Sequence, residues 1–368
     1  MLTKRLSFTC MKQLFIVLFL LYSCLTYSQV TIEGTIPDYA EQPVRIIQYQ
    51  DYFTNKEILI KTVNTNKDGI FKVQFPLKEI QKITIKTNQT KAILFAEPAT
   101  SYNVEMGKKD TNATETIGTE SAVSMILLNQ NDQSLNNRII YFEQMLANFY
   151  ANNNIYFAQP RILQKELLNF KNDIIKKEFS DASEFLKNYI DYSIAPIEEA
   201  CFSNHHYQYK KYFSGNIMYS HPMYMSYFEA YFKQYLKQLS LKPKGVDLFN
   251  EINEMHSYSN ALSTILKVDT LLKNDTLREL ILLSGLREWY YQKDNNRNNI
   301  SLLMNYISLK GLSTQNRIIA ANLLQDMNAL DAGSAAPEML LNHPKYKSIA
   351  DLKGNYVYIN FWAEWNVE

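Results

Sequence analysis

Hydrophobic and polar residues alternate with a period of two in the first part of the chain that follows residue 28. The alternation is clear in Val30–Ile36, and short runs of β-forming residues follow at close intervals. These runs are Val44–Tyr49, Glu57–Val63, Phe71–Phe75, Ile83–Lys86 and Ala92–Phe95. Turn-forming residues separate the runs, as at Asn66–Gly69 and Glu97–Pro98. The pattern predicts a sandwich-like β domain of about six or seven strands over residues 29–107, although a barrel has the same signature.

The hydrophobic spacing then changes to that of helices. Residues 108–120 are polar and rich in threonine, and we interpret them as a linker. Over residues 121–330 apolar side chains recur every three or four positions. Two examples are the stripe of Leu163, Leu167, Phe170 and Ile174, and the stripe of Tyr224, Phe228, Phe232, Tyr235 and Leu239. This spacing predicts an α-helical region of about seven to nine helices, and we find no fixed repeat in it.

Several residues predict where individual helices begin and end. Asp181 and Glu184 are typical of the start of a helix, and Pro196 is expected to kink or end that helix. The segment Thr276–Glu279 has the capping-box pattern, in which the threonine and glutamate side chains bond free amides at a helix start. Ser313 is expected to cap the last helix of the region.

The N-terminus has the features of an export signal. Lys4, Arg5 and Lys12 are positive, and Leu14–Tyr22 is an uncharged apolar run. A membrane span needs about 20 residues, so this run fits the apolar core of a secretory signal instead. The sequence therefore predicts a signal peptide over residues 1–28 and a location in the periplasm or cell envelope.

Two ways of processing this signal remain open. Thr26 and Ser28 are small residues at the −3 and −1 positions of a cleavage site before Gln29, which is the preferred prediction. The alternative is the segment Leu21–Cys24, which resembles a bacterial lipoprotein box with Cys24 as the lipidated residue. We expect a soluble or peripheral protein, held at a membrane only if Cys24 is lipidated.

Composition narrows the classes of function. There are 38 Lys and Arg against 37 Asp and Glu, a formal net charge of +1, so nothing indicates nucleic-acid binding. Only 10 glycines are present and no Gly-rich phosphate loop occurs. The 3 cysteines are too few for a disulfide-dense scaffold or a four-cysteine zinc site. We therefore expect no cofactor and no metal.

The remaining candidate chemistry has ordinary structural explanations. Cys201 follows a helix that we expect to end near Pro196, and neighbouring carboxylates should raise its pKa, so we interpret it as an inert thiol. His205, His206, His221 and His256 have no metal-ligand spacing. The pair Glu198–Glu199 is interpreted as part of a solvated face.

The segment from His205 to Leu239 is dense in aromatic residues and lysines. Aromatic and cationic side chains together can stack on sugars or bases. Their helical spacing, however, favours core packing. If a binding surface exists in this segment, its members are expected to be Tyr207, Tyr209, Lys210, Lys211 and Tyr212.

The C-terminal residues 331–368 carry a more specific pattern. Gly333 and Pro337 bracket a Gly-x-x-x-Pro segment, Gly354 ends a Leu-Lys-Gly turn, and an apolar run follows that contains Phe361 and Trp362 and ends at Trp365. This order and spacing resemble the opening of the redoxin or TlpA branch of the thioredoxin superfamily. The β stretch resembles the small N-terminal domain of many envelope members, in its Ile32–Ile36 opening and its Asp68–Phe71 turn.

The resemblance implies a thiol-disulfide oxidoreductase, but the redox motif is missing. In the family a Cys-x-x-Cys follows the tryptophan, its first thiol activated at a helix N-terminus. Asn366 occupies the first position here, and the second would be residue 369, one past Glu368. An amide caps a helix but is no redox nucleophile. We therefore expect a redox-inactive chain that is the truncated or decayed product of a longer gene, a hypothesis that downstream DNA would test.

Together these features predict an α+β protein: a sandwich-like β domain, a helical region and the start of a thioredoxin-like α/β domain. We expect an envelope thioredoxin-like protein whose partners are other envelope proteins. The alternative is a non-catalytic envelope protein that recognises a peptide or glycan. A redoxin-type peroxidase is less favoured because it too needs a cysteine near position 366.

Overall fold

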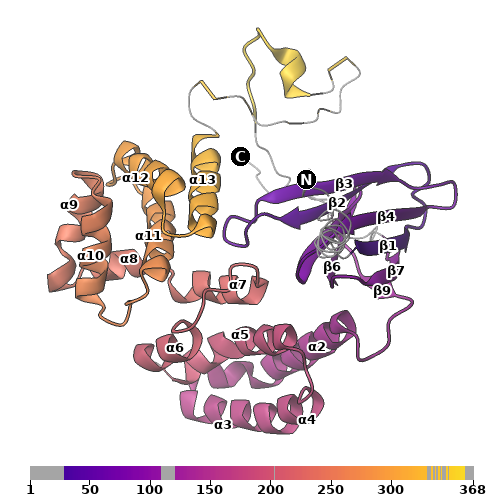
Figure 1. Cartoon of the computed structure of the whole chain (residues 1–368), viewed down its shortest axis with the longest axis horizontal. Helices are drawn as coiled ribbons and strands as arrows, with labels where there is room; N and C mark the ends of the chain where they lie inside the picture. Colours follow the sequence, from indigo (N-terminus) through magenta and orange to yellow (C-terminus); the bar gives the residue numbers. More distant parts are fainter. Residues whose placement is uncertain are drawn as a thin grey trace, which may run out of the picture. The chain divides into compact units, whose positions relative to one another are not determined.

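The computed structural model describes residues 29–108, 121–202 and 204–329, and then residues 333–334, 336, 339, 341, 345–346 and 348–360. The chain divides into two compact units, Met1–Tyr231 and Phe232–Glu368. Strands come first and helices follow, so the predicted α+β class is confirmed (Figure 1).

Two sheets make up the β part of the first unit. Its strands are β1 (Gln29–Thr35), β2 (Pro43–Tyr49), β3 (Glu57–Asn64), β4 (Ile70–Pro76), β5 (Gln81–Lys86), β6 (Thr90–Ala96), β7 (Ser101–Met106), β8 (Ser121–Ala122) and β9 (Met125–Leu127). One sheet has the order β4-β1-β7-β9 and the other the order β3-β2-β5-β6-β8. The pairs β1–β7 and β6–β8 are parallel, and the other pairs are antiparallel.

Residues of both sheets contribute to a single hydrophobic core. In β4 every second side chain is buried, as the alternating sequence predicts. Gly34 of β1 lies so close to the ring of Phe71 that an added Cβ would be 2.4 Å from it. Gly69 has a φ of +76°, which the turn between β3 and β4 requires. The predicted strands and this turn are therefore confirmed.

The strands extend further along the chain than the predicted boundary. Residues 121–127 contribute β8 and β9, and the first helix of the described residues begins only at Leu135. The predicted helical start at residue 121 is thus wrong, because these short segments pair with β6 and β7. Of the predicted linker, residues 109–120 lie outside the described residues.

The helices of the first unit pack beside the five-stranded sheet. They are α2 (Leu135–Asn153), the 3-10 helix η1 (Asn154–Ala158), α3 (Pro160–Phe170), the π-helical turn η2 (Lys171–Ile175), α4 (Lys176–Glu178), α5 (Glu184–Cys201), α6 (His205–Tyr212) and α7 (Pro222–Tyr231). Phe95 of β6 belongs to their hydrophobic core, and Figure 1 shows α2 and α5 below this strand. Asn136 of α2 bonds both the N–H and the C=O of Phe95.

Helix α5 does not end at its proline, which was one of the two predicted outcomes. Pro196 lies inside the helix, which continues to Cys201. A proline inside a helix costs about 3 kcal/mol. Ile194, Ala195 and Ile197 beside it are fully buried, so packing on both sides holds the helix through the proline. Ser183 caps the start by accepting a hydrogen bond from the N–H of Leu186, while Asp181 pairs with Arg138 instead.

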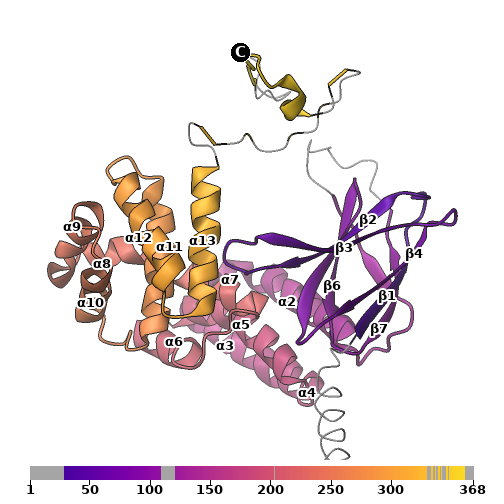
Figure 2. The same cartoon turned by 45° about the horizontal axis from the view of Figure 1, so that its top comes forward.

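The second unit is helical in its described residues. It contains α8 (Tyr235–Ser240), η3 (Pro243–Gly245), α9 (Asp247–Asn253), α10 (Tyr258–Val268), α11 (Asp275–Tyr290), α12 (Arg297–Lys310), α13 (Thr314–Asn328) and the short η4 (Ile349–Leu352). Helices α11, α12 and α13 lie side by side (Figure 2). Gly285 of α11 lets α8 approach closely, because an added Cβ would be 2.4 Å from the side chain of Leu236.

Within the described residues, the helices α2 to α13 outnumber the seven to nine predicted, because apolar stripes cross helix breaks. All five residues of the stripe from Tyr224 to Leu239 are buried, but α7 and α8 divide it. The break lies at Gln234, which has a φ of +55° and donates its N–H to the Glu288 carboxylate.

The two predicted caps of the second unit have different outcomes. Ser313 accepts a hydrogen bond from the N–H of Asn316, so the cap of α13 is confirmed. The capping box at Thr276–Glu279 is wrong, because Asn274 caps α11 two residues earlier. Glu279 is fully buried and accepts hydrogen bonds from α13 and from the loop before it.

None of the helices in the described residues combines the length and the apolar character that crossing a bilayer requires.

Candidate functional site

The residues of the redoxin-like pattern are described only in part. Gly333 and Gly354 have φ values of +96° and +91°, and Gly354 follows η4, where the Leu-Lys-Gly turn is expected. Residues 356–360 of the apolar run form no strand, and Tyr356 and Tyr358 are almost fully exposed. The predicted positions Cys24, Pro337, Phe361, Trp362, Trp365 and Asn366 lie outside the described residues.

Cys201 is the last residue of α5 and is half-buried. Burial, together with the nearby Glu198 carboxylate, raises the pKa of this thiol to about 11. The predicted direction of the shift is therefore confirmed. A thiol with such a pKa is almost entirely protonated at neutral pH and is a poor nucleophile.

The histidines do not gather around a common point. His221 is buried, its Nε2 lies 3.2 Å from the carbonyl oxygen of Phe185, and burial lowers its pKa to about 4. His205 stacks on the ring of Tyr231. Within the described ranges, no three His, Cys, Asp or Glu side chains are placed to hold a metal ion.

Glu198 forms a buried ionic cluster that the sequence did not indicate. Only 3% of the residue is exposed, so its predicted solvated position is wrong. Its carboxylate accepts hydrogen bonds from Lys171, from Lys211 at 2.5 Å and from the Tyr212 hydroxyl at 2.7 Å. Burial alone would raise the pKa of Glu198, but these hydrogen bonds outweigh it and hold the pKa below its usual range.

This Glu198 cluster (Lys171, Glu198, Lys211 and Tyr212) joins three segments. Lys171 begins the π-helical turn η2, Glu198 is on α5, and the other two residues are on α6. With three donors around it, the carboxylate is engaged within the protein. We therefore interpret the cluster as a structural link. The π-turn that presents Lys171 has no signature in the sequence, which explains why the cluster was missed.

The aromatic surface proposed from the sequence does not assemble. Tyr209 and Tyr212 are buried, and Lys211 belongs to the Glu198 cluster. Tyr207, Lys210 and Lys211 are exposed, but Tyr207 packs against Phe202 and Lys211 is bound to Glu198. The side chains of this segment serve the hydrophobic core, which was the favoured alternative.

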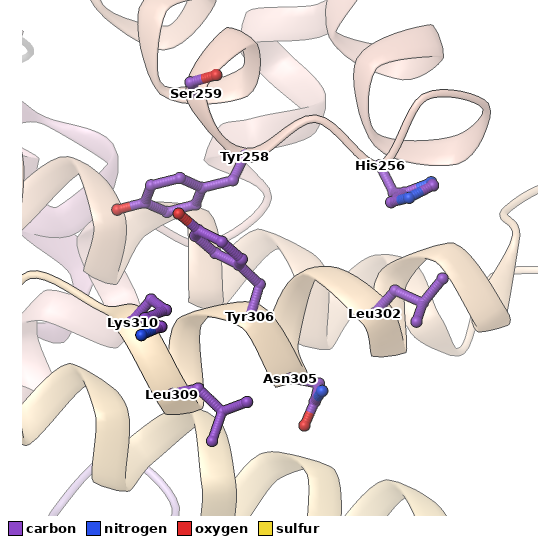
Figure 3. A pocket seen from close by; sticks show the side chains of 8 residues that line it. All are labelled: His256, Tyr258, Ser259, Leu302, Asn305, Tyr306, Leu309 and Lys310. Carbon is purple, nitrogen blue, oxygen red and sulfur yellow. The ribbon is translucent and has the colours of Figure 1, made fainter.

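The second unit contains an open pocket of about 520 Å³ that sequence reasoning missed. It lies between α12 and the start of α10 (Figure 3), and its lining is His256, Tyr258, Ser259, Leu302, Asn305, Tyr306, Leu309 and Lys310. The rings of Tyr258 and Tyr306 have centroids 4.9 Å apart at an angle of 43°. The signal that was available is the spacing of Leu302, Tyr306 and Leu309, which share one exposed face of α12.

Polar groups surround these two rings. The Tyr258 hydroxyl donates a hydrogen bond of 2.5 Å to the buried Glu279, which fixes the position of the ring. Ser259, Asn305 and Lys310 add a hydroxyl, an amide and an ammonium group at the rim. An aromatic surface bordered by such groups can hold a neutral polar ligand by stacking and hydrogen bonding. No arrangement of nucleophile and base occurs among these residues.

No protein-family model matches the chain, and no curated protein matches it.

Proposed function

We propose that this chain is an envelope thioredoxin-like protein of the TlpA or redoxin group that does not exchange disulfides. The observation that carries the proposal is the ordered pattern from Gly333 to Trp365, followed by Asn366 where the family has its nucleophilic cysteine. In this proposal the two sheets, which extend from residue 29 to residue 127, form the sandwich-like N-terminal domain, and residues 331–368 belong to the thioredoxin-like domain. The two-sheet core and the helices that follow it support this layout.

The proposal includes export to the periplasm or cell envelope. The charged start and the apolar run Leu14–Tyr22 support it. Intact mass spectrometry of the protein from an envelope fraction tests it. A chain that begins at Gln29 is expected, and a diacylglyceryl group on Cys24 would show the lipoprotein alternative. A chain that retains residues 1–28 in the cytoplasmic fraction would contradict export.

Capture from an envelope extract tests the absence of disulfide exchange. The immobilised protein is incubated with extract, thiols are blocked with N-ethylmaleimide, and bound proteins are released first by salt and then by dithiothreitol. We expect salt to release all specific partners, because Asn366 cannot form a mixed disulfide. Thiol-rich proteins that only dithiothreitol releases would contradict the proposal. The variant Cys201→Ser shows whether such proteins are attached to Cys201.

A second candidate function is non-catalytic recognition of a glycan or peptide. The pocket around Tyr258 and Tyr306 favours it, since aromatic rings beside hydroxyl and amide groups suit a sugar. Competition of the captured partners by soluble sugars tests this candidate. Tyr306→Ala should remove the competition, whereas Tyr207→Ala, an equally exposed tyrosine of the first unit, should leave it unchanged.

A further inference from the structure

A second cavity, of about 470 Å³, lies in the first unit between strand β6 and the helices α2 and α5. We refer to this cavity as the β6 groove. Its walls are mostly apolar, and they include the side chains of Ile93, Phe95, Met125, Leu127, Ile139 and Ile140. Ile93 and Ile140 are 46% and 44% exposed, so apolar surface is open to a ligand. The volume lies within the range of ordinary ligand pockets.

The edge of the sheet is open inside this groove. The carbonyl of Lys91 accepts a hydrogen bond from the N–H of Val123, and pairing of β6 with β8 ends at Lys91. Four residues further on, Asn136 bonds the N–H and C=O of Phe95 at 2.8 and 2.9 Å. Main-chain groups alternate in direction along a strand, so the N–H and C=O of Ile93 point to the same side as those of Lys91 and Phe95. Among the described residues no strand pairs with Ile93 there.

The groove also carries a positive charge. Lys82 and Lys91 line it, and neither forms an ion pair within the part of the chain that the structure describes. Glu143 contributes one negative charge and accepts a hydrogen bond of 2.5 Å from the Tyr189 hydroxyl. Burial lowers the pKa of Lys82, and Glu143 opposes that shift. With both lysines and Glu143 charged, the groove has a net charge of about +1. This charge suits a ligand with a single carboxylate.

We propose that the β6 groove binds the C-terminal end of an extended peptide. The peptide main chain pairs with the N–H and C=O of Ile93 as a short added strand. An apolar last side chain packs on Ile140, and the terminal carboxylate lies toward Lys82 and Lys91. This binding goes beyond the proposed function, and it depends neither on the redoxin resemblance nor on the pocket around Tyr258 and Tyr306.

Other ligands of similar size fit these groups less well. A neutral sugar would leave the net positive charge of the groove uncompensated. A fatty-acid anion would satisfy the lysines and the apolar wall, but it would leave the polar groups of Ile93 unpaired. A buried polar group without a partner costs about 1–3 kcal/mol. The peptide end satisfies all three features of the groove at once.

Fluorescence anisotropy with a defined probe tests the proposal. The probe is a fluorescein-labelled pentapeptide that ends in valine and leucine with a free carboxylate, and its partner probe ends in an amide. We expect the free carboxylate to bind at least about tenfold more tightly than the amide. Laurate should displace the probe more weakly than the unlabelled peptide does. Equal affinity of the two probes, stronger displacement by laurate, or no binding at about 1 mM protein would overturn the proposal.

Variants with matched controls place the binding at the groove. Lys91→Gln should weaken binding about threefold to tenfold, and Lys61→Gln at the opposite edge of the same sheet should not change it. Ile140→Asp should abolish binding, while Ile162→Asp, a similarly exposed isoleucine on α3, should not. All four positions are at least partly exposed, so circular dichroism should show folded variants. Equal effects of variant and control would contradict the proposed location.

These outcomes are separate from those of the envelope-capture test. Disulfide exchange by the chain would refute the proposed function and leave the peptide result unchanged. Failure of the peptide to bind would leave the redoxin proposal unchanged.

Discussion

Replacing Glu198 by glutamine tests the buried cluster that holds α5 against α6 and the π-turn. The substitution keeps the shape of the side chain and removes its charge. In the native protein the carboxylate is buried, while the side chains of Lys171 and Lys211 are 28% and 30% exposed. In Glu198→Gln two ammonium groups lose the carboxylate to which they donate, and one of them meets the amide NH₂ group.

The size of the effect follows from burial. Breaking a fully buried ion pair costs about 3–5 kcal/mol. Because the two lysines are partly solvated, we expect a smaller effect. The substitution should lower the free energy of opening this part of the first unit by about 2–3 kcal/mol. Since a factor of ten corresponds to about 1.4 kcal/mol, amide hydrogen exchange should accelerate at least about 30-fold in α5 and α6.

Hydrogen–deuterium exchange with mass spectrometry measures this effect segment by segment. The matched control is Glu178→Gln, which changes an exposed glutamate of the same unit and should alter exchange little. If Glu198→Gln accelerated exchange no more than the control does, the reasoning about the cluster would be refuted.

The pH dependence of this effect has a defined sign. Because the pKa of Glu198 is lowered in the folded protein, the carboxylate stabilises the fold above its unfolded pKa of about 4.3. That stabilisation is lost as the pH falls through the lower folded value. The difference between wild type and Glu198→Gln should therefore be greatest above about pH 4.3 and should vanish at lower pH.

Three further predictions concern buried contacts and the thiol. Gly285→Ala should destabilise the second unit by about 1–3 kcal/mol despite the better helix propensity of alanine, because a Cβ would overlap Leu236. Urea unfolding followed by the fluorescence of Trp289 measures this loss of stability, and an unchanged unfolding midpoint would contradict the prediction. Glu279→Gln should lower the same unfolding midpoint, since the Glu279 carboxylate accepts hydrogen bonds from a main-chain N–H, a side-chain amide and a tyrosine hydroxyl. A midpoint equal to that of the wild type would contradict this prediction. Cys201 should react with iodoacetamide at pH 8 at least about tenfold more slowly than glutathione, because the pKa of the Cys201 thiol is about 11. A reaction rate equal to that of glutathione would contradict the raised pKa.

The sequence predicts those elements whose signals are local. Strand alternation in Phe71–Phe75 and the Gly69 turn depend on neighbouring residues, and both are confirmed. The start of α13 is equally local, because the Ser313 side chain bonds an amide three residues away. The break at Gln234 is not local in this sense, since the Glu288 side chain that bonds its N–H comes from another helix.

The sites depend on contacts that have no local signal. The burial of Glu198 follows from lysines 27 residues before it and 13 residues after it, and one of them is turned inward by a π-turn. The β6 groove requires Asn136 and Val123 to leave one residue of the strand unpaired between them. The pattern of hydrophobic residues reveals neither the Glu198 cluster nor the β6 groove, because each depends on polar groups that lie far away in the sequence.

The most direct test of the central claim is the reduction of insulin by dithiothreitol, followed as turbidity when the B chain precipitates. The protein should not raise the rate above that of dithiothreitol alone, because Asn366 cannot attack a disulfide and Cys201 is poorly ionised at neutral pH. A known thioredoxin provides the positive control. A clear increase in rate, whether it disappears or persists in Cys201→Ser, would contradict the account.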